Sequence, residues 1–205
     1  DTSFIHLFAE VKVSFANGLV FHCETKYPYG FQVSYRILEG SGKVAVRRPD
    51  WSTEKFQICV NGKAQENCEK KGYWYLDGIK AGDVIEITLD ERVKKVYASS
   101  IVANDSGCAA LQRGPLVYCV EAVDNEGDVL SLAYAEDGEV KAGEFEPELL
   151  NGTVMLRASG YKTRRTDALY AYEKPERTAC TITAVPYYTW GNRGIGQMRV
   201  WLPER

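Results

Sequence analysis

The sequence is poor in the residues that nucleophilic catalysis and metal binding require. Its 205 residues include only two histidines, His6 and His22. Both fall in predicted strands, and neither a Gly-x-Ser-x-Gly nor a Cys/His signature accompanies them, so no base stands ready to activate a serine or cysteine. The six cysteines include no pair two residues apart, which argues against a thiolate zinc site. We therefore expect neither a bound metal nor a catalytic nucleophile.

The cysteine pattern also bears on disulfides. Free cysteine is among the most buried residue types, so we expect six reduced thiols, mostly in strands. Cys59 and Cys68 flank a predicted hairpin. A disulfide between them is an alternative if the protein is in an oxidising compartment. The six positions are Cys23, Cys59, Cys68, Cys108, Cys119 and Cys180.

Long apolar runs, a basic stripe and a signal segment are missing as well. No apolar run approaches the roughly 18 residues of a membrane span, so we expect no membrane partner. The formal net charge is -3 without a basic stripe, which argues against nucleic acid. The chain opens on a strand-like pattern with neither an initiating Met nor a signal-type segment, so it was processed or is a piece of something longer. We expect a cytoplasmic location and leave secretion open.

What the chain does contain is period-two alternation of apolar and polar residues, without long helical periodicity. Asn-Gly pairs at 17–18 and 61–62 predict hairpins, because both central residues of a type I′ turn need a positive φ. Turn residues recur every 8 to 12 positions or so, which is typical of β-sandwiches. The predicted strands are 11–15, 19–24, 31–38, 44–48, 56–60, 73–76, 84–89, 93–97, 108–112, 116–121, 129–134, 153–157 and 179–185.

The strands predicted between the start of the chain and Tyr97 are numerous enough to form one compact domain. The segment 98–107 is small and polar and marks the boundary, with strand 93–97 closing the first domain. We expect an all-β fold of two consecutive antiparallel β-sandwich domains, residues 1–100 and 101–205. In the second, the acidic stretch 135–148 is interpreted as a solvated loop and 159–178 as a polar excursion.

Glycoside hydrolysis needs two carboxylates at a defined separation. The 28 acidic residues lie mostly in turns or in the acidic stretch, where a charge run is usually a solvated face, so no catalytic pair is assigned. The glycines of 191–196 connect strand to strand and provide no helix N-terminus for a phosphate.

An aromatic run near the C-terminus is the remaining candidate. Four large aromatics lie within residues 187–201, and each buries roughly 150–250 Å² when packed. Core or domain-interface packing is the favoured interpretation, most simply for Tyr187 and Trp201. The alternative is a sugar or interdomain contact made by Trp190, Arg193 and Tyr187 around the turn 191–194. A second aromatic group surrounds Trp74, where one face of the strand must expose aromatics or meet another domain.

Three parts of the chain resemble one known family. They look like the C-terminal β-sandwich region of bacterial β-L-arabinofuranosidases, glycoside hydrolase family 127, with family 146 as a neighbour. The resemblance covers essentially the whole chain. It rests on VAVRRPDW (44–51), VNGK (60–63) and KAGDVIEITL (80–89), on ALQRGPLVYCVEAVDN (110–125), and on TAVPYYTWGNRGIGQMRVWLP (183–203).

The resemblance implies that the chemistry lies elsewhere. In that family an (α/α)6 barrel precedes the sandwiches and carries a Cys nucleophile, a zinc bound by Cys thiolates and a Glu, and a Glu acid/base. None of the six cysteines here aligns with those positions, so no catalytic residue and no cofactor is carried over. We expect a non-catalytic region whose partners are the barrel of the parent chain and a second copy in a homodimer. The rival hypothesis is a carbohydrate-binding module for arabinose-containing glycans.

Overall fold

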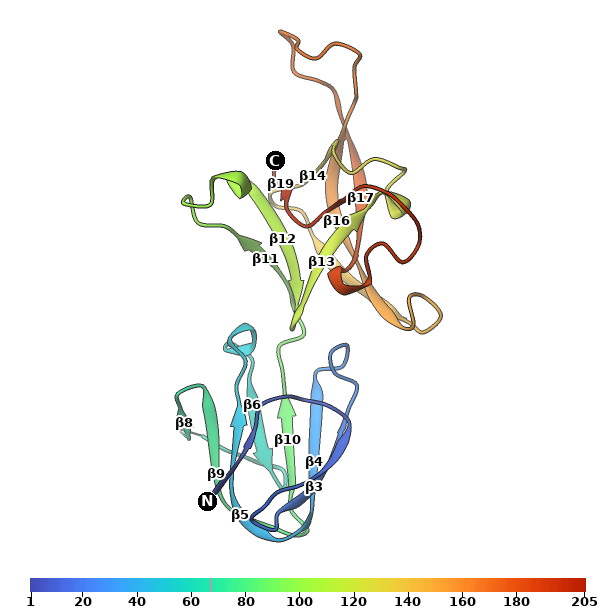
Figure 1. Ribbon diagram of the computed structural model, residues 1–205. Helices are drawn as coiled ribbons and strands as arrows, with labels where there is room; N and C mark the ends of the chain where they lie inside the picture. Colours follow the sequence, from blue (N-terminus) through green and yellow to red (C-terminus); the bar gives the residue numbers. More distant parts are fainter. Residues whose placement is uncertain (67) are drawn as a thin grey trace. The chain divides into compact units, whose positions relative to one another are not determined.

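The computed structural model describes residues 1–66 and 68–205 (Figure 1). Within these residues the regular structure consists of β-strands and short 3-10 turns, without α-helix. The strands form two compact units, residues 1–92 and 93–205. The predicted all-β fold of two consecutive domains is confirmed. No helix in the described ranges has the length and apolar character needed to cross a bilayer.

The first unit is a sandwich of two sheets. One sheet has the strand order β1-β5-β9-β8 and the other the order β2-β3-β4-β10-β6-β7. The sandwich is not purely antiparallel, because β1 runs parallel to β5. The elements are β1 (Thr2–Ile5), β2 (Val11–Ser14), β3 (Val20–Thr25), β4 (Gln32–Glu39), β5 (Ser41–Arg47), η1 (Asp50–Ser52), β6 (Gln57–Val60), β7 (Lys63–Ala64), β8 (Glu69–Lys70), β9 (Tyr73–Lys80) and β10 (Val84–Thr88).

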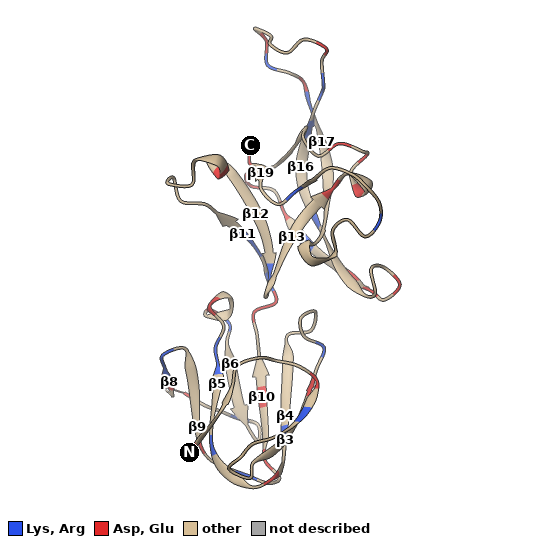
Figure 2. Ribbon diagram, viewed as in Figure 1, with Lys and Arg blue, Asp and Glu red and all other residues tan. Residues whose placement is uncertain are grey.

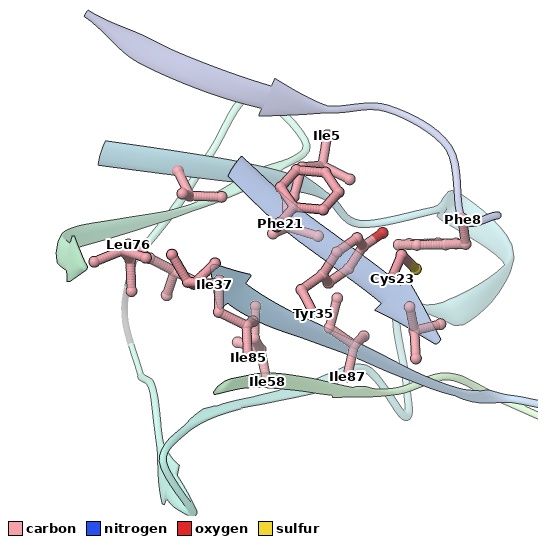
Figure 3. Close-up of a cluster of buried hydrophobic side chains, with 14 of the residues drawn as sticks. Ile5, Phe8, Phe21, Cys23, Tyr35, Ile37, Ile58, Leu76, Ile85 and Ile87 are labelled. Atoms are coloured by element: carbon pink, nitrogen blue, oxygen red, sulfur yellow. The ribbon is translucent and has the colours of Figure 1, made fainter. Parts of the chain in front are cut away.

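The core of this unit lies between the two sheets (Figure 3). Strand alternation directs every second side chain inward, so β4 buries Val33, Tyr35 and Ile37 while the residues between them are more exposed. Burial also raises the pKa of the Cys23 thiol on the neighbouring strand β3. The alternation that predicted these strands is therefore the alternation that fills the core.

The two Asn-Gly pairs form different turns. Asn61 and Gly62 both have positive φ, 50° and 74°, and connect β6 to β7 as a type I′ turn requires. At the first pair only Gly18 has a positive φ, 86°, and the Asn17 side chain accepts a hydrogen bond from the Leu19 N–H. The first hairpin is confirmed, but its loop is longer than a two-residue type I′ turn.

The second unit is a continuous network of paired strands in the order β11-β12-β13-β17-β16-β14. Strands β15, β18 and β19 pair with β16, β13 and β12 beside this path. Its elements are β11 (Val93–Tyr97), η2 (Ala103–Asp105), β12 (Cys108–Arg113), β13 (Leu116–Glu121), η3 (Ala122–Asp124), β14 (Leu132–Tyr134), β15 (Val140–Glu146), β16 (Thr153–Thr163), β17 (Arg177–Pro186), η4 (Tyr187–Thr189), β18 (Met198–Arg199) and β19 (Leu202–Pro203).

The boundary between the units lies between Arg92 and Val93, earlier than the boundary at residue 100. Strand β11, which the sequence pattern places last in the first domain, pairs antiparallel with β12, with Val96 opposite Ala110. The polar segment 98–107 is therefore the connection between two paired strands. Small polar residues are common to inter-strand turns and interdomain linkers, so composition alone does not separate the two.

The strand prediction was wrong in the acidic stretch, and also at residues 159–163, which continue β16 instead of opening the polar excursion. Residues 140–146 form β15, which pairs with β16 and places Val140 opposite Ala158. Almost all of β15 is exposed, as expected of a charged edge strand. An edge strand of this kind is stabilised by backbone pairing, so it lacks the apolar alternation that reveals a buried strand.

All six cysteines are free thiols, so the disulfide left open between Cys59 and Cys68 is not formed. Five of them lie in strands and Cys68 lies just before β8. Cys119 is fully buried, and this burial raises the pKa of its thiol to about 12.

Candidate functional site

The C-terminal aromatic run follows the end of β17. The strand ends at Pro186, after which η4 and an irregular loop lead to β18. Tyr187 is 46% exposed and Trp190 is 45% exposed. Tyr187 is thus a partly exposed residue of a 3-10 turn, and Trp190 presents part of its ring to solvent. Trp201 is partly buried next to β19.

Arg193 is held by two carboxylates of its own unit. Its Nη1 donates to Oδ1 of Asp124 at 2.7 Å, and its Nη2 donates to Oε2 of Glu121 at 2.6 Å and also to Asp124. Glu121 additionally accepts the backbone N–H of Gly191 at 2.9 Å through its other oxygen. The side chains of Arg193 and Glu121 are only 18% and 7% exposed. The loop is therefore tied to the end of β13 and to η3.

These ion pairs change the role that the sequence suggested for Arg193. Hydrogen bonding to Asp124 raises the pKa of Arg193, so the side chain stays charged across the whole working pH range. Because the forked donors are directed at the two carboxylates, the guanidinium acts as an anchor of the 191–194 turn. The sequence analysis missed Glu121 and Asp124. A signal existed, since Glu121 ends the apolar strand LVYCVE, and an acidic residue in such a strand needs a partner.

A cavity of about 460 Å³ lies beside this anchor. Its lining includes Glu121, Val123, Arg193, Ile195 and Gln197. The two aromatics proposed as sugar contacts are not among its lining residues, so the cavity and the exposed rings are separate features. Glu121 and Asp124 share one guanidinium, which leaves them paired rather than available as an acid and a base.

The first unit carries a second aromatic surface, here called the outer aromatic face and defined by Phe4, His6, Tyr73 and Tyr75. Phe4 is 41% exposed, and its ring lies edge-on to those of Tyr73 and Tyr75 at centroid distances of 5.4 and 6.2 Å. Its ring also stacks with that of His6 at 6.0 Å. His6 Nδ1 and the Tyr73 hydroxyl are 2.7 Å apart and share a hydrogen bond.

Strand pairing explains why these rings meet. In the sheet β1-β5-β9, Phe4 pairs with Ala45 and Ala45 pairs with Tyr75, so two aromatics flank a small residue in one row. Trp74 faces the other way and packs on Phe56 at 5.4 Å. Tyr73, Trp74 and Tyr75 are each only partly exposed, and the ring that adds an exposed surface to the Tyr73/Tyr75 face is Phe4 of β1, in the strand-like opening of the chain.

The described residues do not provide a zinc site. No group of three or more His, Cys, Asp or Glu side chains is placed to hold a metal ion in residues 1–66 and 68–205. The donor set of this chain therefore does not fit the zinc of the family that it resembles.

The fold defines a class: a tandem of two all-β domains, residues 1–92 and 93–205. Residues 2–91 match the model described as "Beta-L-arabinofuranosidase, GH127 middle domain". Residues 93–203 match "Glycoside hydrolase family 127 C-terminal domain". The chain belongs to glycoside hydrolase family 127, of which it contains the middle and C-terminal domains.

Similar proteins are longer than this chain. A non-reducing end β-L-arabinofuranosidase of Bifidobacterium longum subsp. longum is 37% identical over 95% of this chain and 32% of that protein. The crystal structure of a GH127 β-L-arabinofuranosidase from Geobacillus stearothermophilus T6 matches with a TM-score of 0.92 and 31% identity, over 100% of this chain and 34% of that one. A second structure, of a GH127 β-arabinofuranosidase, matches with a TM-score of 0.89 and 28% sequence identity. The match covers 100% of this chain and 35% of that one. The chain thus spans about a third of the length of these relatives.

Proposed function

We propose that this chain is the non-catalytic accessory region of a β-L-arabinofuranosidase-type glycoside hydrolase, and that it holds the catalytic barrel of that enzyme in shape. The matches to a middle and a C-terminal domain, over about a third of each relative, support this role. The zinc and the catalytic residues belong, in this proposal, to the barrel. The observation that carries the proposal is the outer aromatic face.

Several features favour the barrel as the partner of this face. A domain that precedes a middle domain connects to it through the first strand, and here that strand, β1, carries Phe4. Three aromatic rings and one imidazole are already packed against one another. Binding of a partner to this face therefore costs little additional side-chain conformational entropy. Aromatic residues are enriched at the buried centres of protein interfaces.

The test has two arms. This chain alone, supplied with zinc and a chromogenic β-L-arabinofuranoside, is expected to give no turnover. In the full-length enzyme, the double substitution Phe4→Ala and Tyr75→Ala is expected to shorten the half-life of activity at elevated temperature about tenfold. The reason is that truncating a central interface aromatic costs more than about 1 kcal/mol.

Leu38→Ala is the matched control, since Leu38 is a comparably exposed apolar residue on β4 of the other sheet. It is expected to leave the half-life unchanged. Turnover by the isolated chain would refute the non-catalytic role. An unchanged half-life in the Phe4/Tyr75 variant would remove the outer aromatic face as the contact.

A carbohydrate-binding role is the second candidate, and the exposed ring of Trp190 favours it. An exposed indole can stack on the apolar face of a sugar ring, although Arg193 is already engaged by Glu121 and Asp124. Under this proposal the chain binds arabinose-containing oligosaccharides saturably, and Trp190→Ala lowers the affinity at least tenfold in calorimetric titration. Tyr172→Ala, an exposed aromatic elsewhere in the same unit, is the control. Absence of saturable binding by the unmodified chain would exclude this role.

A further inference from the structure

The hairpin of β16 and β17 extends beyond the rest of the second unit. The two strands stay paired as far as Thr163 opposite Arg177, whereas β14 accompanies β16 only to Lys162. Residues 164–176 connect the strands as an outward loop, which we call the arm (Figure 1, orange). Every residue of the arm is exposed.

The backbone of the arm is almost free of hydrogen bonds to other backbone. At the base of the arm the Arg164 N–H donates to the Glu176 carbonyl at 2.9 Å. Among the residues that the structure describes, those from 165 to 175 belong to no strand and make no backbone–backbone hydrogen bond. Exposed loops of this kind are preferred sites of proteolytic cleavage, because the chain needs no local unfolding to enter a protease.

Basic residues single out one peptide bond of the arm. The arm contains Arg164, Arg165 and Lys174 (Figure 2, blue). Lys174 precedes Pro175, whose fixed φ and missing N–H restrict how a protease can bind this bond. Arg165 is the first residue beyond the backbone bond at the base, and its side chain is 64% exposed. Its ion pair with Asp128, at 3.2 Å, is weak enough for a carboxylate in a protease pocket to replace.

The other connections of the second unit offer no comparable bond. Four of them contain neither lysine nor arginine: 98–107, 122–131, 135–139 and 147–152. The loop 187–197 contains Arg193, whose guanidinium is held by Glu121 and Asp124 and whose side chain is 18% exposed. The arm therefore combines an unpaired backbone with an accessible arginine.

We propose that the bond between Arg165 and Thr166 is a processing site for a trypsin-class serine endopeptidase. The protease serine attacks the Arg165 carbonyl carbon, the C–N bond breaks, and the Thr166 nitrogen takes up a proton and leaves as a new amino terminus. Water then hydrolyses the acyl-enzyme and leaves a carboxylate on Arg165. This inference is independent of the accessory role proposed above.

The cleaved chain stays assembled. Strands β16 and β17, which lie on opposite sides of the cut, are joined by eight residue pairs. The fragment 166–205 also contributes Ile182 and Leu202 to the core of the second unit, and both side chains are fully buried. Separation of the fragments would expose this core to water, so the cut leaves two chains held together without a covalent bond.

The first test is limited digestion of this chain with trypsin, with the products identified by intact mass spectrometry. The first products are expected to be residues 1–165 and 166–205. The cleaved protein is expected to elute with the intact chain in size-exclusion chromatography and to keep its circular dichroism spectrum. A first cut at Lys63, Lys70 or Lys71 of the first unit would overturn the proposal, and so would separation of the two fragments in native buffer.

A second test assigns the cut to the arginines. The double substitution Arg164→Gln and Arg165→Gln is expected to slow the first tryptic cut at least about tenfold, because the remaining bonds require local opening of the fold. Arg157→Gln is the matched control, since Arg157 is an exposed arginine of β16 whose backbone is paired with both β15 and β17. It is expected to leave the rate unchanged. An equal rate for the double variant and the unmodified chain would refute the assignment.

Chymotrypsin separates the role of the arginines from that of the arm itself. This protease cleaves beside large aromatic residues, and Tyr170 and Tyr172 lie fully accessible in the same arm. The unmodified chain and the Arg164/Arg165 double variant are expected to be cut there at equal rates. A double variant that resists chymotrypsin as well would show that the substitutions changed the arm, and Arg165 would lose its assignment.

Discussion

Arg193→Ala is expected to lower the free energy of unfolding of the second unit by about 3 kcal/mol, the low end of the range for removing one partner of a buried ion pair. The substitution leaves Glu121 and Asp124 facing each other without the guanidinium that now bridges them. Glu121 is 7% exposed, so water cannot fully replace the lost donor. The loss is mainly the cost of an unpaired buried charge.

The measurement is urea unfolding of the whole chain, followed by circular dichroism and tryptophan fluorescence. Arg164→Ala serves as the control, because it removes an arginine–glutamate pair whose two side chains are 74% and 78% exposed. Exposed pairs contribute little, so this variant is expected to change stability by less than about 0.5 kcal/mol. If Arg193→Ala proves no more destabilising than Arg164→Ala, the anchoring role of Arg193 is wrong.

Gly160→Ala is expected to destabilise the second unit by about 3 kcal/mol, at the upper end of the range for overpacking a core. The inward positions of β16 become steadily smaller, from Leu156 through Ala158 to Gly160. An added Cβ at position 160 would lie 2.5 Å from the Ala133 carbonyl oxygen on β14 and would also overlap the Ile182 side chain. A backbone oxygen held in a sheet cannot move aside as a flexible side chain can, so β14 has to shift.

Thermal unfolding monitored by circular dichroism tests this, with an expected fall in the melting temperature on the order of 10 °C. Gly196→Ala is the matched control in the same unit. A Cβ there meets only the Ala122 side chain at an ordinary 3.6 Å, so the melting temperature is expected to stay within a degree or two. A Gly160→Ala protein as stable as the control would show that β14 does not depend on the missing side chain.

Local pattern was enough to predict most strands. Alternation in β4 and β10 and the Asn61-Gly62 turn depend on neighbours in the sequence, and all three were confirmed. The same alternation places Tyr73 and Tyr75 on one face of β9 and Trp74 on the other, and all three side chains are partly exposed. Alternation did not predict that Phe4 is their neighbour, because Phe4 is brought next to them by the parallel pairing of β1 with β5.

The candidate site also combines features that neighbouring residues determine with features that depend on distant parts of the chain. The position of Trp190 beside a turn follows from the sequence of the loop, whereas its partial exposure and the partners of Arg193, 69 and 72 residues away in the chain, come from the structure. The positive charge of Arg193 does not by itself indicate whether the side chain binds a carboxylate of its own domain or a sugar from outside. The edge strand β15 was missed for a related reason, since its stability comes from the backbone of β16 and leaves no apolar signal.

The sequence by itself determined the all-β class, the two-domain organisation and the resemblance to family 127, because alternation, turn residues and residue strings are properties of short segments. The tertiary structure alone decided that β11 belongs to the second unit, that Arg193 is an anchor, and that Phe4 joins Tyr73 and Tyr75. It also decided that Leu169, Tyr170 and Tyr172 stay exposed in the loop between β16 and β17. Each of these depends on which distant strands pair, and pairing is set by the burial of whole faces rather than by any one segment.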